Sequence, residues 1–296
     1  MPAFKLIRQK RFKDYPSGSA ITYWKEGFLI TGDDATEILK LDVELNVSGK
    51  IKVESYPEKQ IPKPVKPDYE ASVLIHTPIG DRLLLLGSAA TPVRKKISLV
   101  SLEEPNQVIH LNTDIFSRRL NKLGIRELNL EGITQIGSDL LLANRGNLGY
   151  PENHLILTGA DFWTNQASVL LRLIHLDFKK MTQDFTGVSD LYYLAEADKL
   201  FMCTTSEATS NVYDDGAIGK SYLVWVNDFT SKIKLDSCSP DGWLDLQTLD
   251  KSFVGQKIEG LCVEESSTGN FLIQLVSDND SGETGWFELT GSGLSK

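Results

Sequence analysis

Apolar runs separated by short polar turns recur along the whole chain and form five copies of one pattern. Each copy has an acidic or small polar residue, a small residue and an apolar run, followed by a Gly/Asp/Asn turn, a second apolar run and a polar cluster. The copies begin at Ser19, Glu70, Glu131, Ser189 and Glu259, so successive copies lie 51 to 70 residues apart. Two apolar runs joined by such a turn are typical of a β-hairpin. A repeat of this length indicates the blades of a β-propeller with loop insertions.

The two ends of the chain predict how the ring of blades closes. Only 37 residues follow Glu259 and 18 precede Ser19, and together they supply about one repeat. Residues 4–9 have the pattern of a strand, and we predict that this N-terminal strand completes the last blade. The expected fold is an all-β, five-bladed β-propeller with four-stranded antiparallel blades, in one domain spanning residues 1–296. Six blades, which would require a further copy of the pattern, are the alternative.

Local patterns place the other elements. Helical spacing occurs only at residues 114–123, where we expect Thr113 to cap the start of a helix and Gly124 to end it. Residues 57–67, rich in Lys and Pro, are expected to be a stiff connection between blades. Further strands are predicted at residues 21–23, 28–30, 50–54, 133–136, 140–143, 154–157 and 168–173.

Composition narrows the classes of partner. The formal net charge of −9 disfavours nucleic acid and anionic membrane surfaces. We interpret the basic residues Arg8, Lys10, Arg11 and Lys13 as protection of a sheet edge. The three cysteines have no CxxC spacing and are expected to be free thiols. Because the sequence has neither a visible secretory signal nor a run of about twenty apolar residues, we expect a cytoplasmic protein. We also expect it to be a monomer. A secreted protein whose signal lies outside this sequence is the alternative.

Propeller geometry brings the polar ends of the repeats together. The start of the first strand and the end of the second strand of each hairpin lie on one face, next to the axis, where a concave mouth suits a ligand. An inner ring is predicted from Ser19, Glu70, Glu131, Ser189 with Asp190, and Glu259. A second ring is predicted from Asp33, Asp34, Ser88, Asn144, Arg145, Ser206, Glu207, Asp278, Asn279 and Asp280. The predicted ligand-binding residues are Asp33, Asp34, Asn144, Asp190, Glu207, Asp278 and Asn279.

Carboxylates gathered near an axis repel one another and require a counter-charge, a shared proton or a bound cation. Arg145 is the one cation within the repeat pattern. We therefore predict a divalent ion held by Glu131, Glu259 and Asp278. Ca²⁺ prefers such oxygen ligands, and Mg²⁺ or no metal at all are the alternatives. In another interpretation, the carboxylates accept hydrogen bonds from backbone N–H groups of the neighbouring blade. Arg145 has two possible roles: it could bind a phosphate or carboxylate of a ligand, or it could form a salt bridge with Glu131.

Two repeats carry a recognisable motif. Glu131-Gly132 and Glu259-Gly260 are each followed by a hairpin, which ends in Asn144-Arg145 or in Ser277-Asp278-Asn279-Asp280. This pattern resembles that of the bacterial esterase-like phytase and related uncharacterised propeller families. The resemblance implies a propeller fold and hydrolysis of a phosphoester or ester. A more distant resemblance to gluconolactonase-like propellers implies that Glu131, Asn144 and Asp278 surround one divalent metal.

Three functions follow from these patterns. The first is a propeller that binds a small molecule, glycan or peptide at the mouth of its channel. The second is a metal-assisted hydrolase of a lactone or phosphoester, with Glu131, Arg145 and Glu259 as catalytic residues. The third is a scaffold that binds a protein through rim loops at residues 146–153 or 206–219. The sequence contains no P-loop, GxGxxG, GxSxG or HExxH pattern that would favour other chemistry.

Overall fold

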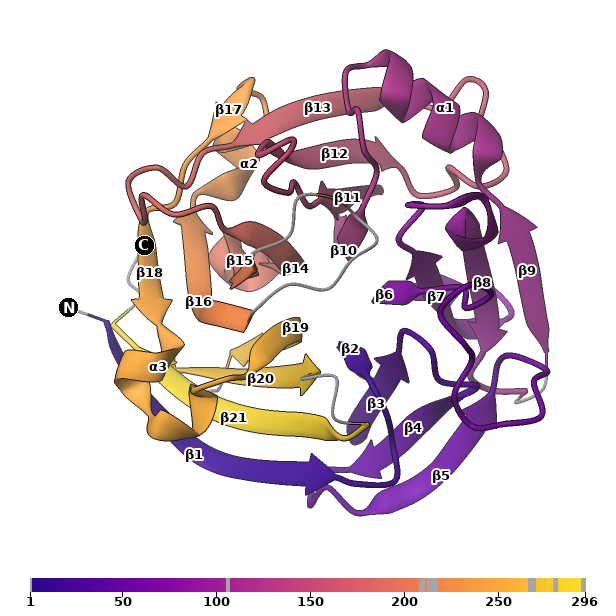
Figure 1. Cartoon of the computed structure of the whole chain (residues 1–296), viewed down its shortest axis with the longest axis horizontal. Coiled ribbons are helices and arrows are strands. Elements are labelled where there is room, and N and C mark those ends of the chain that lie inside the picture. Colours follow the sequence, from indigo (N-terminus) through magenta and orange to yellow (C-terminus); the bar gives the residue numbers. More distant parts are fainter. Residues whose placement is uncertain are drawn as a thin grey trace.

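Five β-sheets surround a common axis in the computed structural model, which describes residues 2–104, 107–207, 211, 218–265, 270–278 and 282–293 (Figure 1). Each sheet is one blade, and its strands run in order from the axis outward. The first blade contains β2 (Gly18–Tyr23), β3 (Gly27–Gly32), β4 (Glu37–Asp42) and β5 (Val47–Lys52). The second contains β6 (Tyr69–Thr77), β7 (Gly80–Gly87), β8 (Lys96–Ser101) and β9 (Val108–Asn112).

The other three blades follow in chain order. The third contains β10 (Leu130–Ile136), β11 (Asp139–Asn144), β12 (Asn153–Gly159), β13 (Leu171–Leu176) and the short β17 (Ser237–Cys238). The fourth contains β14 (Gly187–Leu194), β15 (Lys199–Glu207), β16 (Ile218–Asn227) and β18 (Gly242–Asp245). The fifth contains β19 (Lys257–Glu265), β20 (Phe271–Asp278), β21 (Thr284–Ser292) and β1 (Ala3–Phe12). The predicted five-bladed propeller is thus confirmed, and the six-bladed alternative is wrong.

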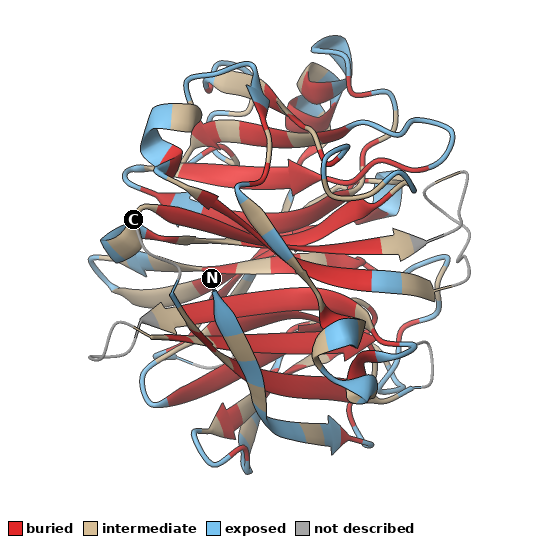
Figure 2. Cartoon of the chain, turned by 90° about the vertical axis from the view of Figure 1, so that its left-hand side faces the viewer, coloured by how far each residue is buried: buried red, intermediate tan, exposed pale blue. Residues whose placement is uncertain are grey.

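The N-terminal strand closes the ring as predicted. β1 pairs antiparallel with β21, from Ala3 opposite Ser292 to Phe12 opposite Thr284. Figure 2 shows this strand, next to the N-terminus, on the outside of the molecule, and its burial pattern is largely exposed or intermediate. The basic residues of β1 also make specific contacts. Arg8 forms an ion pair with Glu288 (Nη2 to Oε2, 2.5 Å), and Lys10 donates from Nζ to the carbonyl oxygen of Leu45 in the first blade (2.6 Å).

Helices lie only in connections among the described residues. α1 (Asp114–Lys122) lies between the second and third blades, α2 (Phe229–Lys232) and α3 (Leu246–Leu249) lie in or after the fourth, and none of the three could cross a bilayer. The predicted helix is confirmed, and Gly124 follows it at a φ of 119°. Thr113 occupies the N-cap position as predicted, but its side chain makes no capping hydrogen bond. Short 3₁₀ turns occur at Pro92–Arg94, Ala195–Ala197 and Lys251–Phe253.

Some strand bounds differ from the predictions. β13 begins at Leu171 instead of residue 168, because Ser168 and Val169 are in a turn and donate to the carbonyl oxygen of Asn165. β5 ends at Lys52 instead of residue 54. β17 was not predicted: the segment that joins β16 to β18 pairs in parallel with β13 of the preceding blade. A two-residue parallel bridge leaves no hydrophobic alternation in the sequence from which to predict it.

The hydrophobic core lies between the blades. Five clusters of buried side chains each join two neighbouring blades, and together they run around the ring. In Figure 2 most of the strand residues are coloured as buried. Close packing at the axis requires glycine after the first residue of two repeats. A Cβ at Gly132 would lie 3.0 Å from the Leu191 nitrogen, and one at Gly260 would lie 2.8 Å from the Cα of Ala20.

Candidate functional site

Each inner strand has an irregular pairing at the residue that begins its repeat. The register shifts lie at Ser19, Glu70, Glu131, Ser189 and Glu259, between the paired residues on either side. An extra residue of this kind redirects a side chain out of the regular alternation of the strand. The inner strands also contact one another around the ring. The five repeat starts therefore reach the axis at one end, as the sequence predicts.

The carboxyl groups at this end are close enough to affect one another. Glu131 and Glu259 both raise the pKa of Glu70, and Asp278 raises the pKa of Asp33, in each case after the larger effect of burial. We call this set the acidic mouth. It comprises Asp33, Asp34, Asp68, Glu70, Glu131, Glu259 and Asp278.

The two serines at repeat starts have a structural role. Ser19 donates from Oγ to the carbonyl oxygen of Tyr69 (2.5 Å), and Ser189 donates to that of Ile258 (2.7 Å). Tyr69 and Ile258 each precede the repeat start of the following blade. A serine at this position therefore ties its blade to the next one, and the acidic mouth depends on the three glutamates of the inner ring.

Glu131 is buried beside a cation from its own blade. Its Oε2 lies 3.8 Å from Nη1 of Arg145, and Asn129 donates from Nδ2 to its Oε1. The side chains of Glu131 and Arg145 are only 7% and 4% exposed. Arg145 also packs closely against Gly187, where a Cβ would lie 2.4 Å from its Nε. The structure therefore contains the ion pair that the sequence offered as the alternative for Arg145.

Glu259 also has a cation close to it. Lys257 Nζ lies 2.8 Å from Glu259 Oε1, and Lys257 is the Cα partner of Asp278 across the hairpin of β19 and β20. Burial nevertheless raises the pKa of Glu259 well above its ordinary value; Lys257 opposes this shift, while Asp278 and Glu131 add to it. Lys257 therefore offsets only part of the effect of burial on Glu259.

A lysine from the connection between blades pairs with two members of the acidic mouth. Among the described residues, Asp33, Asp68 and Glu70 bring carboxylate oxygens within 4.8 Å of one another. Lys66 Nζ forms an ion pair with Asp33 Oδ2 and lies 2.9 Å from Asp68 Oδ1. Asp33 and Asp68 raise the pKa of Lys66 against the opposing effect of its burial, so its ammonium stays charged.

Asp68 connects this lysine to a second buried cation. Its Oδ2 lies 2.7 Å from Arg94 Nη1 and also accepts a hydrogen bond from Ser88 Oγ. Asp68 is 2% exposed, and its φ of 58° places it in the left-handed region. Both oxygens of Asp68 are therefore used within the protein.

Glu70 differs from every other member of the acidic mouth. Its carboxyl group makes no hydrogen bond or ion pair with any residue that the structure describes, although Lys66 is close enough for a Coulombic attraction. Burial, followed by the charges of Asp68, Glu131, Asp33 and Glu259, raises its pKa well above the ordinary value. An inner-ring carboxyl group is thus left without a hydrogen-bond or ion-pair partner among the described residues.

Asp190 braces the ring. Its Oδ2 accepts the backbone N–H of Leu261 in the next blade (2.8 Å), and its Oδ1 accepts that of Leu191 (2.7 Å). This is the bracing role that the sequence offered as the alternative for the inner carboxylates. Burial still raises the pKa of Asp190 well above its ordinary value. The register shift makes Ser189, and not Asp190, the residue equivalent to Glu131.

The remaining predicted residues vary in their surroundings. Gln60 donates to Asp34 Oδ2 (2.7 Å), and Asp34 Oδ1 is buried with no described partner. Asn144 is 1% exposed and accepts the backbone N–H of Asn129 at Oδ1 (2.9 Å), which fixes the end of β11. Glu207 lies in β15 with its backbone paired to Ile218, and its side chain is outside the described residues. Asn279 also lies outside them.

The predicted metal ligands do not form a group. Glu131, Glu259 and Asp278 are not among the described residues whose carboxylate oxygens all lie within 4.8 Å of one another. In the group that does, Asp33 with Asp68 and Glu70, the first two hold the Lys66 ammonium, and the second oxygen of Asp68 is used by Arg94. A calcium ion requires about six to eight oxygen ligands. The donor set of the described residues does not fit it while Lys66 is present.

Asp33 is expected to make stability depend on pH. Burial raises its pKa to about 7. Because the folded pKa is above the unfolded value, the stabilisation is fully present below about pH 4 and is lost as the pH rises through about 7. We expect the contribution of Asp33 to the free energy of unfolding to fall over this range by on the order of 3 kcal/mol. Because other buried carboxyl groups such as Glu70 also have raised pKa values, Asp33→Asn should reduce the slope in urea unfolding between pH 4 and 8 without abolishing it.

Asp42 provides a control, because its pKa is lowered whereas that of Asp33 is raised. It is partly exposed at the end of β4, and hydrogen bonds from the backbone of Asn46 lower its pKa. Its contribution is therefore present above the unfolded pKa and lost as the pH falls, so Asp42→Asn should leave the slope between pH 4 and 8 unchanged. An equal slope in wild type and Asp33→Asn would contradict the assignment to Asp33.

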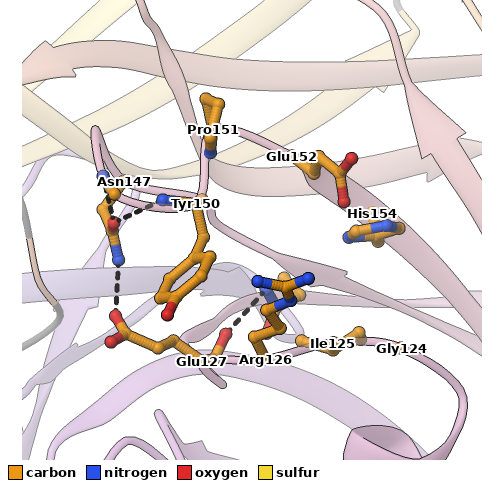
Figure 3. Close-up of a pocket in the computed structure, with 12 residues that line it drawn as sticks. Gly124, Ile125, Arg126, Glu127, Asn147, Tyr150, Pro151, Glu152 and His154 are labelled. Atoms are coloured by element: carbon orange, nitrogen blue, oxygen red, sulfur yellow. Dashed lines mark hydrogen bonds between the residues drawn. The ribbon is translucent and has the colours of Figure 1, made fainter.

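A second concave site lies beside the acidic mouth, at a rim loop of the third blade (Figure 3). This side pocket, lined by residues 124–127, 144, 146–147, 149–152 and 154, encloses about 260 Å³. Asn147 holds the loop by donating to Glu127 Oε2 (2.7 Å) and by accepting the backbone N–H of Tyr150 (3.0 Å). The Arg126 guanidinium lies 5.5 Å from the centre of the Tyr150 ring. The rim loop predicted at residues 146–153 thus borders a preformed pocket.

Sequence reasoning missed the cations that neutralise most of the mouth. Lys66, Arg94 and Lys257 lie outside the repeat pattern, and Asp68 precedes it. Lys66 and Asp68 alternate with Glu70, and Lys257 stands two residues before Glu259. These charged residues lie within four positions of a repeat start, and this proximity in sequence was the available signal.

Comparisons with known proteins identify a family and support the fold. Residues 14–290 match a family of unknown function, DUF6929. Among solved structures, a glutaminyl cyclase from Myxococcus xanthus has a TM-score of 0.56 at 9% identity, covering 98% of each chain. A luciferin-regenerating enzyme has a TM-score of 0.47 at 10% identity, covering 100% of this chain and 97% of that one. No curated protein matches. At 9% identity the likeness to the glutaminyl cyclase concerns the fold alone. None of these findings is specific to phytases.

Proposed function

We propose that the protein binds a small molecule or peptide at its acidic mouth, through a protonated amino group of the ligand. The chain belongs to the DUF6929 family, whose function is unknown, so the proposal rests on the site itself. The observation that carries the proposal is the carboxyl group of Glu70, which lacks a described partner and has a raised pKa. Carboxyl groups in the mouth also outnumber the basic side chains Lys66, Arg94, Arg145 and Lys257 that accompany them.

An ammonium group suits this environment. It has three donors, and Lys66 already uses its own to bring Asp33 and Asp68 together. A second ammonium beside Glu70 would offset the effects of burial and of the neighbouring carboxylates, which together raise the pKa of Glu70. A hydrogen bond to a charged group contributes about 1.5–3 kcal/mol, which is enough to orient a small ligand.

Hydrolysis of a phosphoester is less well supported. A phosphate would face the carboxyl groups of the mouth, and each described basic side chain there is already paired with a carboxylate. A divalent ion would have to displace Lys66 from between Asp33 and Asp68. The metal-assisted hydrolase is therefore the second candidate, supported by the close approach of three carboxylates.

The test is calorimetric titration of the wild type and Glu70→Gln at pH 7.5. The probes are benzylamine, tri-alanine with a free amino terminus, and N-acetylated tri-alanine. We expect the free amine to bind and acetylation to weaken binding by about tenfold or more, as expected for the loss of one charged hydrogen bond. Binding of benzylamine but not tri-alanine would identify a small-molecule amine as the ligand class.

Glu70→Gln should lose amine binding and gain stability. A group with a raised folded pKa contributes stability that is present below the unfolded pKa, near 4.3 for Glu, and lost as the pH rises through the folded pKa. The neutral amide avoids that loss, so the variant should unfold at higher urea concentration at pH 8. Unchanged amine binding in Glu70→Gln would refute the proposal. A shift in melting temperature with calcium chloride, abolished in the same variant and unaffected by amines, would favour the metal-assisted alternative.

A further inference from the structure

The other end of the axis holds a cavity of different chemistry. It encloses about 210 Å³ and is lined by residues of all five inner strands, β2, β6, β10, β14 and β19. These residues follow the repeat starts along each strand, for example Ile21 to Tyr23 after Ser19 and Ile133 to Gln135 after Glu131. The cavity therefore opens away from the acidic mouth. We call it the neutral mouth.

The neutral mouth has few groups that could carry a charge. Its polar lining comprises hydroxyl and amide groups of Thr22, Ser72, Thr134, Gln135 and three tyrosines. The carboxyl group of Asp190 also borders it, but both oxygens accept backbone N–H groups and burial raises its pKa well above the ordinary value. His76 at the rim is paired with Asp81 (2.8 Å). Apart from Asp190 and His76, the described lining contains no acidic or basic side chain.

Several hydroxyl groups here have unused donor capacity. Thr22 and Ser72 share one hydrogen bond (2.8 Å), which uses only one of their two O–H donors. Thr134 accepts the backbone N–H of Tyr193 at Oγ1 (3.0 Å), which leaves its own O–H available. Polar groups of this kind in a cavity require partners, and water or a ligand can supply them.

Two tyrosines add apolar surface and further donors. Burial raises the pKa values of Tyr23 and Tyr192, so both hydroxyl groups stay protonated at neutral pH. Neither hydroxyl group has a hydrogen-bond partner among the residues that the structure describes. A tyrosine presents both a flat apolar ring and a polar tip to a ligand. Flat apolar faces alternating with hydroxyl donors match a sugar ring, whose C–H faces are apolar and whose edge is hydroxylated.

We propose that the neutral mouth binds an uncharged, polyhydroxylated ligand, namely a single sugar or the end of a glycan. The cavity is smaller than the roughly 300–1,000 Å³ of pockets for drug-sized ligands, so one ring is the expected size. The acidic mouth is not required for this binding, because the residues that contact the sugar come from the opposite halves of the inner strands.

The test uses saturation-transfer NMR and calorimetry on the full chain with D-glucose, D-galactose, D-mannose and myo-inositol. At least one is expected to bind the wild type. Tyr192→Phe and Ser72→Ala should each raise its Kd by about fivefold, the loss of one neutral hydrogen bond of ~1 kcal/mol. Tyr150→Phe, at the side pocket on the other face, is the matched control and should leave the Kd unchanged.

The methyl glycoside of the preferred sugar distinguishes a free sugar from the end of a glycan as the natural ligand. Binding of the glycoside would indicate the end of a glycan, and its rejection would indicate a free sugar. Absence of binding by all four probes would overturn the proposal, as would a Kd unaffected by both Tyr192→Phe and Ser72→Ala. Circular dichroism and urea unfolding of both variants distinguish a lost contact from a lost fold.

Discussion

Replacing Asp68 with alanine is expected to lower the free energy of unfolding by about 3–5 kcal/mol, the range for breaking a buried ion pair. Asp68 is 2% exposed, and its two oxygens contact Lys66 Nζ (2.9 Å) and Arg94 Nη1 (2.7 Å). The side chains of these cations are only 12% and 4% exposed. The substitution removes the carboxylate that they share, and water cannot replace it fully at this depth. Urea unfolding at pH 7 measures the loss.

Asp228→Ala is the matched control for the backbone. Asp228 also has a positive φ, 48° against 58° for Asp68, but it is exposed and contacts no buried cation among the described residues. Alanine in the left-handed region costs roughly 1–2 kcal/mol relative to its usual conformation, so both variants carry this penalty. The difference between them reports the buried ion pairs. Equal destabilisation of the two variants would contradict the role assigned to Asp68.

The fold could be predicted because its information is local and repeated. Each inner hairpin has its own turn and its own two apolar runs, so five weak patterns support one another. The sequence also marks two of the register shifts. At Glu131-Gly132 and Glu259-Gly260, a polar residue is followed by a glycine that permits close approach of the next blade. The closing strand followed from the same pattern, because residues 4–9 lacked any other blade to join.

The pairing of charges within the mouth could not be predicted in the same way. It depends on contacts between segments that the repeat pattern does not include. The connection at residues 57–67 was expected to be only a spacer, yet it supplies Lys66 to Asp33, 33 residues away in sequence. Arg94 likewise reaches Asp68 from a short turn between β7 and β8. Sequence could therefore predict where carboxyl groups gather, but not which of them stay unpaired.

The serine repeat starts illustrate the same limit on a smaller scale. Ser189 and Asp190 are adjacent, and the sequence alone does not decide which of them occupies the inner ring. The bulge assigns that place to Ser189 and turns Asp190 toward the N–H of Leu261 in the next blade. Both side chains thus join the fourth blade to the fifth, but through different groups: Ser189 bonds to the carbonyl oxygen of Ile258, and Asp190 accepts the N–H of Leu261.

Deleting residues 1–13 is expected to remove several kcal/mol of stability and to open the ring. β1 supplies the outer strand of the fifth blade, and Phe12, 7% exposed, packs in the core between the fifth and first blades. Burial of one such side chain contributes about 1.5–3 kcal/mol. The deletion also removes the Arg8–Glu288 ion pair and the Lys10 bond to Leu45. Urea unfolding and size-exclusion chromatography should show a lower midpoint and self-association through the uncovered edge of β21.

A synthetic peptide of residues 2–13 added to the shortened chain should restore the midpoint, because the edge of β21 offers the same hydrogen bonds to a separate strand. A peptide carrying Phe4→Asp and Phe12→Asp keeps the backbone donors and acceptors but loses the two aromatic contacts, Phe4 with Trp225 and Phe12 within the core. It should fail to restore the midpoint. If the shortened chain unfolds at the wild-type urea concentration without any peptide, β1 does not hold the ring closed, and the five blades are stable through their mutual cores alone.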